Sequence, residues 1–181
     1  MTNKLKNIIF AKCGEHCNEK LLEIIDRKER EQITNDDVFW WGYNSDTCHP
    51  LNKIKPFVDN YEKIYLLISI IDNNKKKDGD RATKYSINNK DWKDINKTIN
   101  VKGSKYAFIC KNLKRVNFEI DLNEYIVPIG EKKNKRLSEY FKGQISYGCG
   151  ILKEKEKNEA KKLKQINYIA ELEAPYSVFL K

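Results

Sequence analysis

A short aromatic segment, residues 38–43, constrains the fold more than any other part of the chain; it reads VFWWGY. In an extended strand, alternate side chains point to opposite faces, so Trp40 would lie on one face and Trp41 and Tyr43 on the other. Because both faces are apolar or aromatic, the strand must be central in a sheet or leave one aromatic face for a ligand. Large aromatic side chains usually belong to a core, so we expect at least one of the two tryptophans to be buried.

The first 71 residues predict alternating strands and helices. Residues 5–13 and 62–71 are apolar runs typical of buried strands. Residues 15–32 and 50–60 place apolar side chains at helical spacing. With the aromatic segment between the two helices, these runs predict a β-α-β-α-β opening.

The rest of the chain predicts short strands. Residues 72–81 are charged or polar and contain no apolar side chain. Beyond them, strand-like runs are separated by turn residues, at 105–111, 116–122, 125–129, 144–152, 165–173 and 176–180. A chain of 181 residues is long enough for one buried core and short for two. We therefore expect a single α+β or α/β domain over residues 1–181, with a possible subdivision into an α/β layer (1–71), a mobile charged loop (72–81) and a strand-rich basic part (82–181).

Positive charge is unevenly distributed along the chain, whose formal net charge is +9. Residues 1–71 hold 10 basic and 11 acidic side chains, whereas residues 72–181 hold 25 basic and 15 acidic ones. Clustered lysines and arginines favour an anionic partner, because they release condensed counterions when they meet phosphates. The alternative is a lysine-rich solvated surface with no ligand.

Aromatic and basic residues together suggest recognition of nucleic acid, in which rings stack on bases and cations hold the backbone. We expect Trp40, Trp41 and Tyr43 to offer stacking surfaces or a pocket wall. The basic side chains expected to contact phosphate are Lys75, Lys76, Lys77, Arg81, Lys114, Arg115, Lys133 and Arg136. The aromatics and the absence of a helix-turn-helix pattern favour RNA or single strands over duplex DNA.

A zinc site is an alternative use of the cysteines. Cys13, Cys17, Cys48 and His49 would supply four ligands of the types that zinc prefers. Their spacing differs from the usual paired cysteines, and adjacent Cys48 and His49 cannot easily reach one ion from a regular strand. Burial of Cys13 and Cys17 as small apolar residues is the other interpretation, and we expect no bound metal or cofactor.

Two patterns raise the possibility of catalysis. Glu119 and Asp121 alternate, so on a strand both carboxylates would project from one face, where they could hold Mg²⁺. Cys149, between Gly148 and Gly150, is a candidate nucleophile. A solvated strand face and a close backbone approach explain the same residues without chemistry. We therefore expect a protein that is not an enzyme.

The chain lacks the features of an exported or membrane protein. The N-terminal segment has no signal-peptide pattern, and the longest apolar run is far shorter than a membrane span. Five cysteines, an odd number, argue against a disulfide framework. We expect a cytoplasmic location with reduced thiols and no membrane partner, and the sequence leaves the oligomeric state open.

Residues 35–45, which read NDDVFWWGYNS, resemble a strand of EVE and related PUA-like domains. In those domains a Gly-Asp pair precedes an apolar and aromatic run. This chain lacks the leading glycine and continues into a Cys-His-Pro turn. The resemblance implies a compact β-barrel as an alternative fold, with an aromatic cage for a modified base.

Three classes of function fit these patterns. The first is a non-enzymatic protein of bacterial or phage origin that binds nucleic acid or a nucleoprotein. The second is a phage-type, anti-CRISPR-like inhibitor that occupies the nucleic-acid channel of a guided host nuclease in antiviral defence. The third is a small metal-dependent nuclease or nucleotide-processing enzyme. The charge and the aromatics favour the first class.

Overall fold

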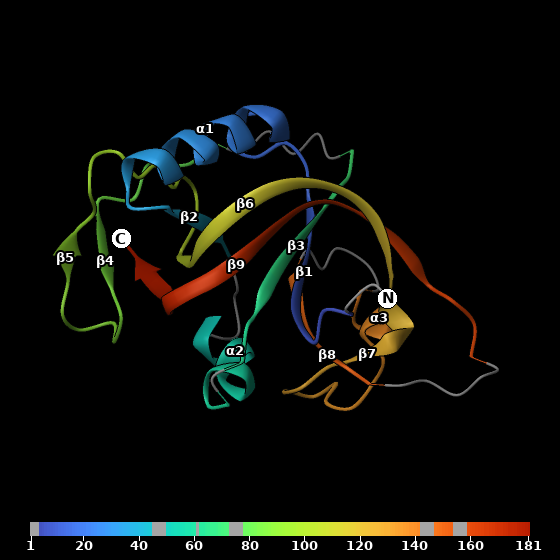
Figure 1. Cartoon of the computed structure of the whole chain (residues 1–181). Coiled ribbons are helices and arrows are strands. Elements are labelled where there is room, and N and C mark those ends of the chain that lie inside the picture. The colour runs from blue at the N-terminus through green and yellow to red at the C-terminus, as the bar shows by residue number, and fades with distance from the viewer. Residues whose placement is uncertain (1–3, 45–49, 61, 73–77, 142–146, 154–158) are drawn as a thin grey trace. The chain divides into compact units, whose positions relative to one another are not determined.

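The computed structural model (Figure 1) describes residues 4–44, 50–60, 62–72, 78–141, 147–153 and 159–181. The chain is a mixed, sheet-rich α+β protein with three helices in this described part. Its elements are β1 (Asn7–Cys13), α1 (Leu21–Thr34), β2 (Val38–Tyr43), α2 (Pro50–Val58), β3 (Tyr65–Ile70), β4 (Lys84–Ser86), β5 (Lys93–Asp94), β6 (Tyr106–Asp121), the 3₁₀ turn η1 (Leu122–Glu124), β7 (Tyr125–Ile126), α3 (Leu137–Tyr140), β8 (Tyr147–Leu152) and β9 (Leu163–Leu180).

The chain forms two compact units, and each unit gathers three separate segments. Unit 1 contains Met1–Cys13, Lys53–Ile71 and Lys114–Ala170. Unit 2 contains Gly14–Asn52, Asp72–Leu113 and Glu171–Lys181. The long strands β6 and β9 therefore contribute residues to both units. The β-α-β-α-β layer expected for residues 1–71 and the subdivision at 72–81 stay predictions.

Unit 1 is organised around β1, which lies between two partner strands. The strand order in this unit is β6-β9-β3-β1-β8-β7. β1 pairs in parallel with β3, from Ile8 opposite Tyr65 to Cys13 opposite Ile70. On its other side β1 pairs antiparallel with β8. The two neighbouring strands hydrogen-bond to the backbone N–H and C=O groups on both edges of β1. The strand is therefore central in the sheet, which explains its nearly continuous burial.

One face of β1 carries the core of unit 1. Ile8 and Phe10 are fully buried and pack with Leu67 of β3 and with Leu137 of α3. Further buried members of this cluster come from β6, η1, β7, the residue after β7, and β9; they are Ile120, Leu122, Tyr125, Val127 and Ile166. The short helix α3 is thus held on the sheet by Leu137, which leaves the residues at its end near the surface.

Unit 2 buries the aromatic segment in β2. This strand pairs antiparallel with β6, from Val38 opposite Lys111 to Tyr43 opposite Tyr106. Trp40 and Trp41 are 8% and 5% exposed, so the expected burial of at least one tryptophan is confirmed. The Trp40 ring meets Tyr85 edge-on with centroids 5.0 Å apart.

The helix α1 packs beside β2 and ends in a tight turn. The Glu23 carboxylate accepts a hydrogen bond from the Lys20 backbone N–H at 2.8 Å, which caps the first turn. Asp36 and Asp37 adopt positive φ angles of 52° and 64°, a conformation that aspartate tolerates better than most residues. This turn brings the chain directly from α1 into β2.

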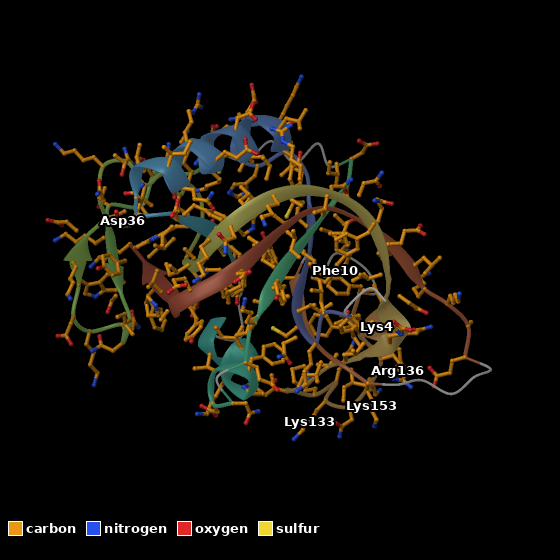
Figure 2. The ribbon with its side chains drawn as sticks, viewed as in Figure 1. Lys4, Phe10, Asp36, Lys133, Arg136 and Lys153 are labelled. Carbon is orange, nitrogen blue, oxygen red and sulfur yellow. The ribbon has the colours of Figure 1, made fainter. Side chains whose placement is uncertain are left out.

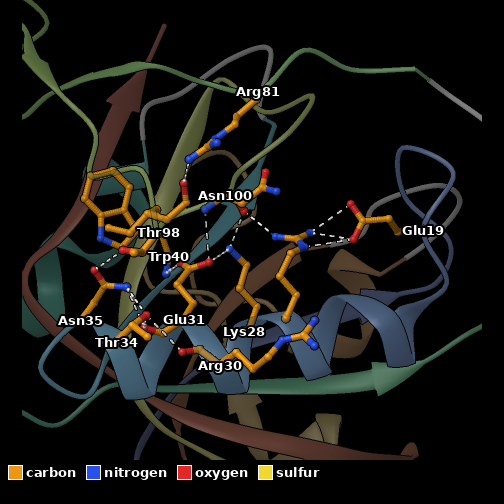
Figure 3. A network of polar contacts seen from close by, with 12 residues as sticks. Glu19, Lys28, Arg30, Glu31, Thr34, Asn35, Trp40, Arg81, Thr98 and Asn100 are labelled. Carbon is orange, nitrogen blue, oxygen red and sulfur yellow. Dashed lines mark hydrogen bonds and ion pairs between the residues drawn. The ribbon is translucent and has the colours of Figure 1, made fainter.

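A buried ion pair joins α1 to β2 and to the loop before β6 (Figure 3). The Lys28 ammonium donates to Glu31 Oε2 at 2.9 Å and to the Asn100 carbonyl at 2.8 Å. Glu31 Oε1 accepts the Trp40 backbone N–H at 2.9 Å, and Oε2 accepts the Asn100 N–H at 3.3 Å. Burial lowers the pKa of Lys28 to about 8, and the Glu31 carboxylate opposes that shift. The pair therefore satisfies backbone groups that no strand partner takes.

Two of the predicted strand boundaries are wrong. The runs at 105–111 and 116–122 form one strand, β6, of 16 residues, and the runs at 165–173 and 176–180 form one strand, β9, of 18 residues. The polar residues that predicted turns lie on solvated strand faces, as the exposure of Lys114 and Arg115 shows. In the described part of the chain, no helix has the length and apolar character needed to cross a bilayer.

Replacing Lys28 tests the buried ion pair. Lys28→Met leaves the Glu31 carboxylate buried without its cation, so we expect the free energy of unfolding to fall by about 3–5 kcal/mol. Adding Glu31→Gln removes the stranded charge and should recover part of that loss. Urea unfolding measures both.

The matched control is Arg30→Met, on the exposed side of the same helix. This variant should change the free energy of unfolding by less than about 0.5 kcal/mol. Equal losses for Lys28→Met and Arg30→Met would show that the pair does not hold unit 2 together.

Candidate nucleic-acid interface

The two units differ sharply in charge. Unit 1 contains 19 basic and 10 acidic residues, a balance of +9. Unit 2 contains 16 basic and 16 acidic residues, a balance of zero. The whole net charge of the protein therefore belongs to unit 1, a division that no continuous segment of the sequence reveals.

Many lysines of unit 1 are exposed and have no acidic partner. Lys4 pairs with Glu124 at 2.6 Å, and Arg136 pairs with Glu159 at 2.8 Å. Within the described ranges, six further exposed lysines make no ion pair: Lys114, Lys133, Lys135, Lys153, Lys161 and Lys162. Figure 2 shows the side chains of Lys4, Lys133, Arg136 and Lys153 at one end of this unit.

Two lysines of unit 1 lie over a pair of half-buried aromatic rings at the end of α3. Tyr140 and Phe141 contact each other edge-on, with centroids 5.7 Å apart. The Lys132 ammonium lies 5.9 Å from the Tyr140 ring centroid, and the Lys12 ammonium lies 5.3 Å from that of Phe141. Phe141 also packs edge-on against Phe10 of the core at 4.8 Å. We call Lys12, Lys132, Tyr140 and Phe141 the α3 aromatic site.

Glycine in β8 makes room for these rings. A Cβ atom on Gly148 would lie 2.8 Å from Tyr140 Cδ1 and 3.0 Å from two ring atoms of Phe141. On Gly150 it would lie 2.9 Å from Leu137 and 3.0 Å from Tyr125. The close backbone approach predicted for this glycine-rich segment is confirmed, and its purpose is to seat α3.

The aromatic residues predicted to stack on bases lie in unit 2 and are packed inside it. Trp40, Trp41 and Tyr43 are 8%, 5% and 2% exposed. The Tyr43 ring is stacked on Phe108, with centroids 4.6 Å apart and 10° between the planes. The stacking role predicted for the three residues is not compatible with this packing. Sequence alternation could not reveal it, because both faces of β2 are covered.

The predicted phosphate contacts divide between the units. Lys114, Arg115, Lys133 and Arg136 belong to unit 1, whereas Arg81 belongs to unit 2. The Arg81 guanidinium donates to the backbone carbonyls of Lys97 and Ile99 at 2.5 and 2.7 Å, so it fixes a loop of unit 2. Lys75, Lys76 and Lys77 lie outside the described residues.

The two carboxylates proposed for Mg²⁺ differ in environment. Glu119 is exposed, whereas Asp121 is 7% exposed. Asp121 Oδ1 accepts the backbone N–H groups of Asn123 and Lys162, at 3.0 and 2.8 Å. This carboxylate therefore caps η1 and fixes the start of β9. No group of three or more histidine, cysteine or acidic side chains suited to a metal occurs among the residues that the structure describes.

The described cysteines are buried thiols. Cys13, Cys17 and Cys149 are 9%, 9% and 6% exposed, and none of the three forms a disulfide bond. Burial raises the pKa of Cys13 to about 12, against the effect of the Tyr147 hydroxyl 3.8 Å away. Such a thiol is a poor nucleophile at neutral pH. Cys48 and His49 lie outside the described residues, so the structure does not test the zinc alternative.

Only a weak sequence signal marks the α3 aromatic site. Tyr140 and Phe141 are adjacent, follow the basic run at 132–136 and precede Gly148. The tryptophans of β2 carry a stronger sequence signal, because they are larger and stand next to each other in an aromatic segment. What connects Lys12 to Phe141 is tertiary contact across more than a hundred residues, which a single sequence does not show.

Comparison with known proteins identifies no relative. No protein family, no curated protein and no solved structure matches the chain.

A substitution in β8 tests whether the Tyr140 and Phe141 rings pack on Gly148. Gly148→Ala places a Cβ against Tyr140 and Phe141, so we expect the free energy of unfolding to fall by about 1–3 kcal/mol. In a Phe141→Leu background the contacts with the Phe141 ring are removed and the Tyr140 contact remains, so the cost of Gly148→Ala should fall by at least about 0.5 kcal/mol. Urea unfolding of the four proteins gives this coupling. Additive losses would show that the rings do not rest on Gly148.

Proposed function

We propose that the protein binds single-stranded nucleic acid, free or within a nucleoprotein, through unit 1. The observation that carries this proposal is the uncompensated charge of unit 1 next to half-buried aromatic rings. Cations supply affinity for the phosphate backbone, and rings accept bases of any sequence. RNA is favoured over duplex DNA, because helix recognition would need an element that enters a groove.

The exposed lysines supply the long-range part of the interaction. Lys133 and Lys135 lie in the turn between β7 and α3, and Lys153 follows β8. The turn is held by backbone hydrogen bonds, from Asn134 N–H to Val127 O at 2.8 Å and from Val127 N–H to Lys135 O at 2.9 Å. Its lysines are therefore presented from an ordered backbone, so less conformational entropy is lost on binding.

The aromatic rings supply the short-range part. Tyr140 and Phe141 are fixed by the core through Phe10 and by the seat at Gly148. A ring held in place can stack on a base at a contribution of about 1–3 kcal/mol. The proposed mechanism needs no metal, cofactor or catalytic group. The protein acts by binding the nucleic acid.

Salt dependence tests the proposal. The affinity for a labelled single-stranded RNA should fall steeply with added salt, linearly in a plot of log K against log salt concentration. Replacing Lys133, Lys135 and Lys153 together by glutamine should make the slope less steep by up to about two, because single strands give roughly 0.7 per phosphate contact. Fluorescence anisotropy measures both.

The matched control replaces three exposed lysines of neutral unit 2, Lys90, Lys93 and Lys97, by glutamine. This control removes the same charge from the protein and should leave the slope unchanged. No binding at low salt, or equal effects of the two triple variants, would contradict the proposal. Tight binding only to a protein–RNA complex would point to the nucleoprotein.

A further inference from the structure

The two rings of the α3 aromatic site are held in different ways, and Phe141 is the one that the sheet clamps. Its ring meets Phe10 of β1 edge-on, with centroids 4.8 Å apart. Lys12 lies two residues further along the same face of β1, and its ammonium is 5.3 Å from the Phe141 centroid. Gly148 of β8 stands opposite Phe10, and a Cβ there would lie 3.0 Å from two atoms of the Phe141 ring. Two strands therefore fix the Phe141 ring.

This clamp makes Phe141 a poor stacking partner for a base. A base needs the face of a ring, and the Lys12 ammonium lies over the face of Phe141. Lys12 is half-buried, so moving its ammonium aside would remove the ring contact that stabilises a partly desolvated charge. Phe10 is 0% exposed and cannot make room from the side of the core. The contacts of Phe141 are thus those of an anchor.

Tyr140 is positioned by this anchor and carries a weaker cation contact. Its ring meets Phe141 edge-on at 5.7 Å, and a Cβ on Gly148 would lie 2.8 Å from its Cδ1. The ammonium over the Tyr140 ring belongs to Lys132, in the turn before α3, and lies 5.9 Å from the centroid. That distance is close to the limit of about 6 Å for such contacts, so a stacked base can replace this cation at little cost.

We propose that Tyr140 takes one unpaired base, and that Phe141 and Lys12 are positioning residues that act through it. The assignment rests on the proposed function and names the residue at which the base is held. The Lys12 ammonium keeps Phe141 against the sheet, and the edge of Phe141 sets the plane of the Tyr140 ring. When a base stacks on Tyr140, the Lys132 ammonium turns to the phosphate of the same nucleotide, where its hydrogen bond is charge-assisted. The site holds a single base and, because every base has a face to stack, it accepts any of the four.

The base contact is measured as a ratio of two affinities. Fluorescence anisotropy at low salt gives the affinity for a short single-stranded RNA and for the same backbone without bases. Tyr140→Ala should lower this ratio by about fivefold to a hundredfold, the range for loss of one stacked base, whereas Tyr140→Phe should preserve it. Restoring one base to the base-free oligonucleotide should recover most of the ratio. Equal gains from each further base would contradict a site for one base.

Lys12 tests the positioning role. Lys12→Met should lower the ratio by at least about threefold, because the Phe141 ring loses its cation, and Lys12→Arg should restore it, because a guanidinium makes the same kind of contact. The charge lost in Lys12→Met weakens binding to both oligonucleotides and cancels in the ratio. The matched control is Lys55→Met, an exposed lysine of unit 1, which should leave the ratio unchanged.

Double variants show through which ring these residues act. In a Tyr140→Ala background, neither Lys12→Met nor Phe141→Leu should lower the ratio further, since residues that act through Tyr140 have no effect without it. A further fall with Phe141→Leu would show that Phe141 itself takes a base, and would overturn the assignment. If Tyr140→Ala does not fold, as judged by circular dichroism, Tyr140→Leu takes its place with the same expected fall.

The outcomes separate the assignment from the proposed function. If both oligonucleotides bind with a steep salt dependence but Tyr140→Ala leaves the ratio unchanged, the proposed function stands and the assignment is wrong. If neither oligonucleotide binds at low salt, the proposed function is wrong and the assignment falls with it.

Discussion

Uncompensated positive charge in unit 1 is the constraint on which this account depends. Unit 1 comprises about half of the 181 residues and carries a net charge of +9, whose self-repulsion opposes compaction of the unit. The burial of apolar side chains within the unit must offset this repulsion. The fully buried face of β1, with Ile8, Phe10 and Leu67, supplies that burial. Part of the charge lies at the surface on lysines, such as Lys133 and Lys153, that make no ion pair with the residues that the structure describes. Such a surface is stabilised when an anion binds.

Unit 2 handles charge in the opposite way. Its acidic and basic residues balance, and its most buried charges, Lys28 and Glu31, are paired with each other and with backbone groups. Unit 2 also contains a contact between a cation and a ring, since the Lys181 ammonium lies 5.6 Å from the Trp92 centroid. Without an excess of positive charge around it, this contact lacks the electrostatic part of a nucleic-acid site. The contrast in charge between the units therefore favours unit 1 as the location of the proposed nucleic-acid site.

The elements of the fold could largely be predicted from sequence, because their signals are local. The apolar runs of β1 and β3 and the helical spacing of α1 needed only periodicity. The length of β6 and β9 could not be predicted, since solvated residues within a long strand resemble a turn. The aromatic strand β2 was expected to be partly buried, and the burial of its aromatic residues depends on partners such as Phe108 that only the fold brings to it.

The candidate site was harder to predict than the fold, for a physical reason. Charge adds up over space, and unit 1 collects its lysines from three separate segments. A count along the chain found the excess after residue 71, but it could not assign that excess to one unit. Likewise the contact between Lys12 and Phe141 requires β1 and α3 to pack together. Composition therefore suggests the type of partner that we propose, whereas the aromatic residues predicted to meet it are buried in unit 2.

Photo-crosslinking identifies the residues of the protein that contact a single-stranded RNA. A single-stranded RNA that carries 4-thiouridine is irradiated with the protein at low salt, and the modified peptides are identified by mass spectrometry after trypsin digestion. If unit 1 binds RNA as we propose, adducts form on the peptide of residues 137–142, which contains Tyr140 and Phe141. Adducts confined to unit 2, for example at Trp92, or the absence of any adduct at low salt, would contradict this proposal.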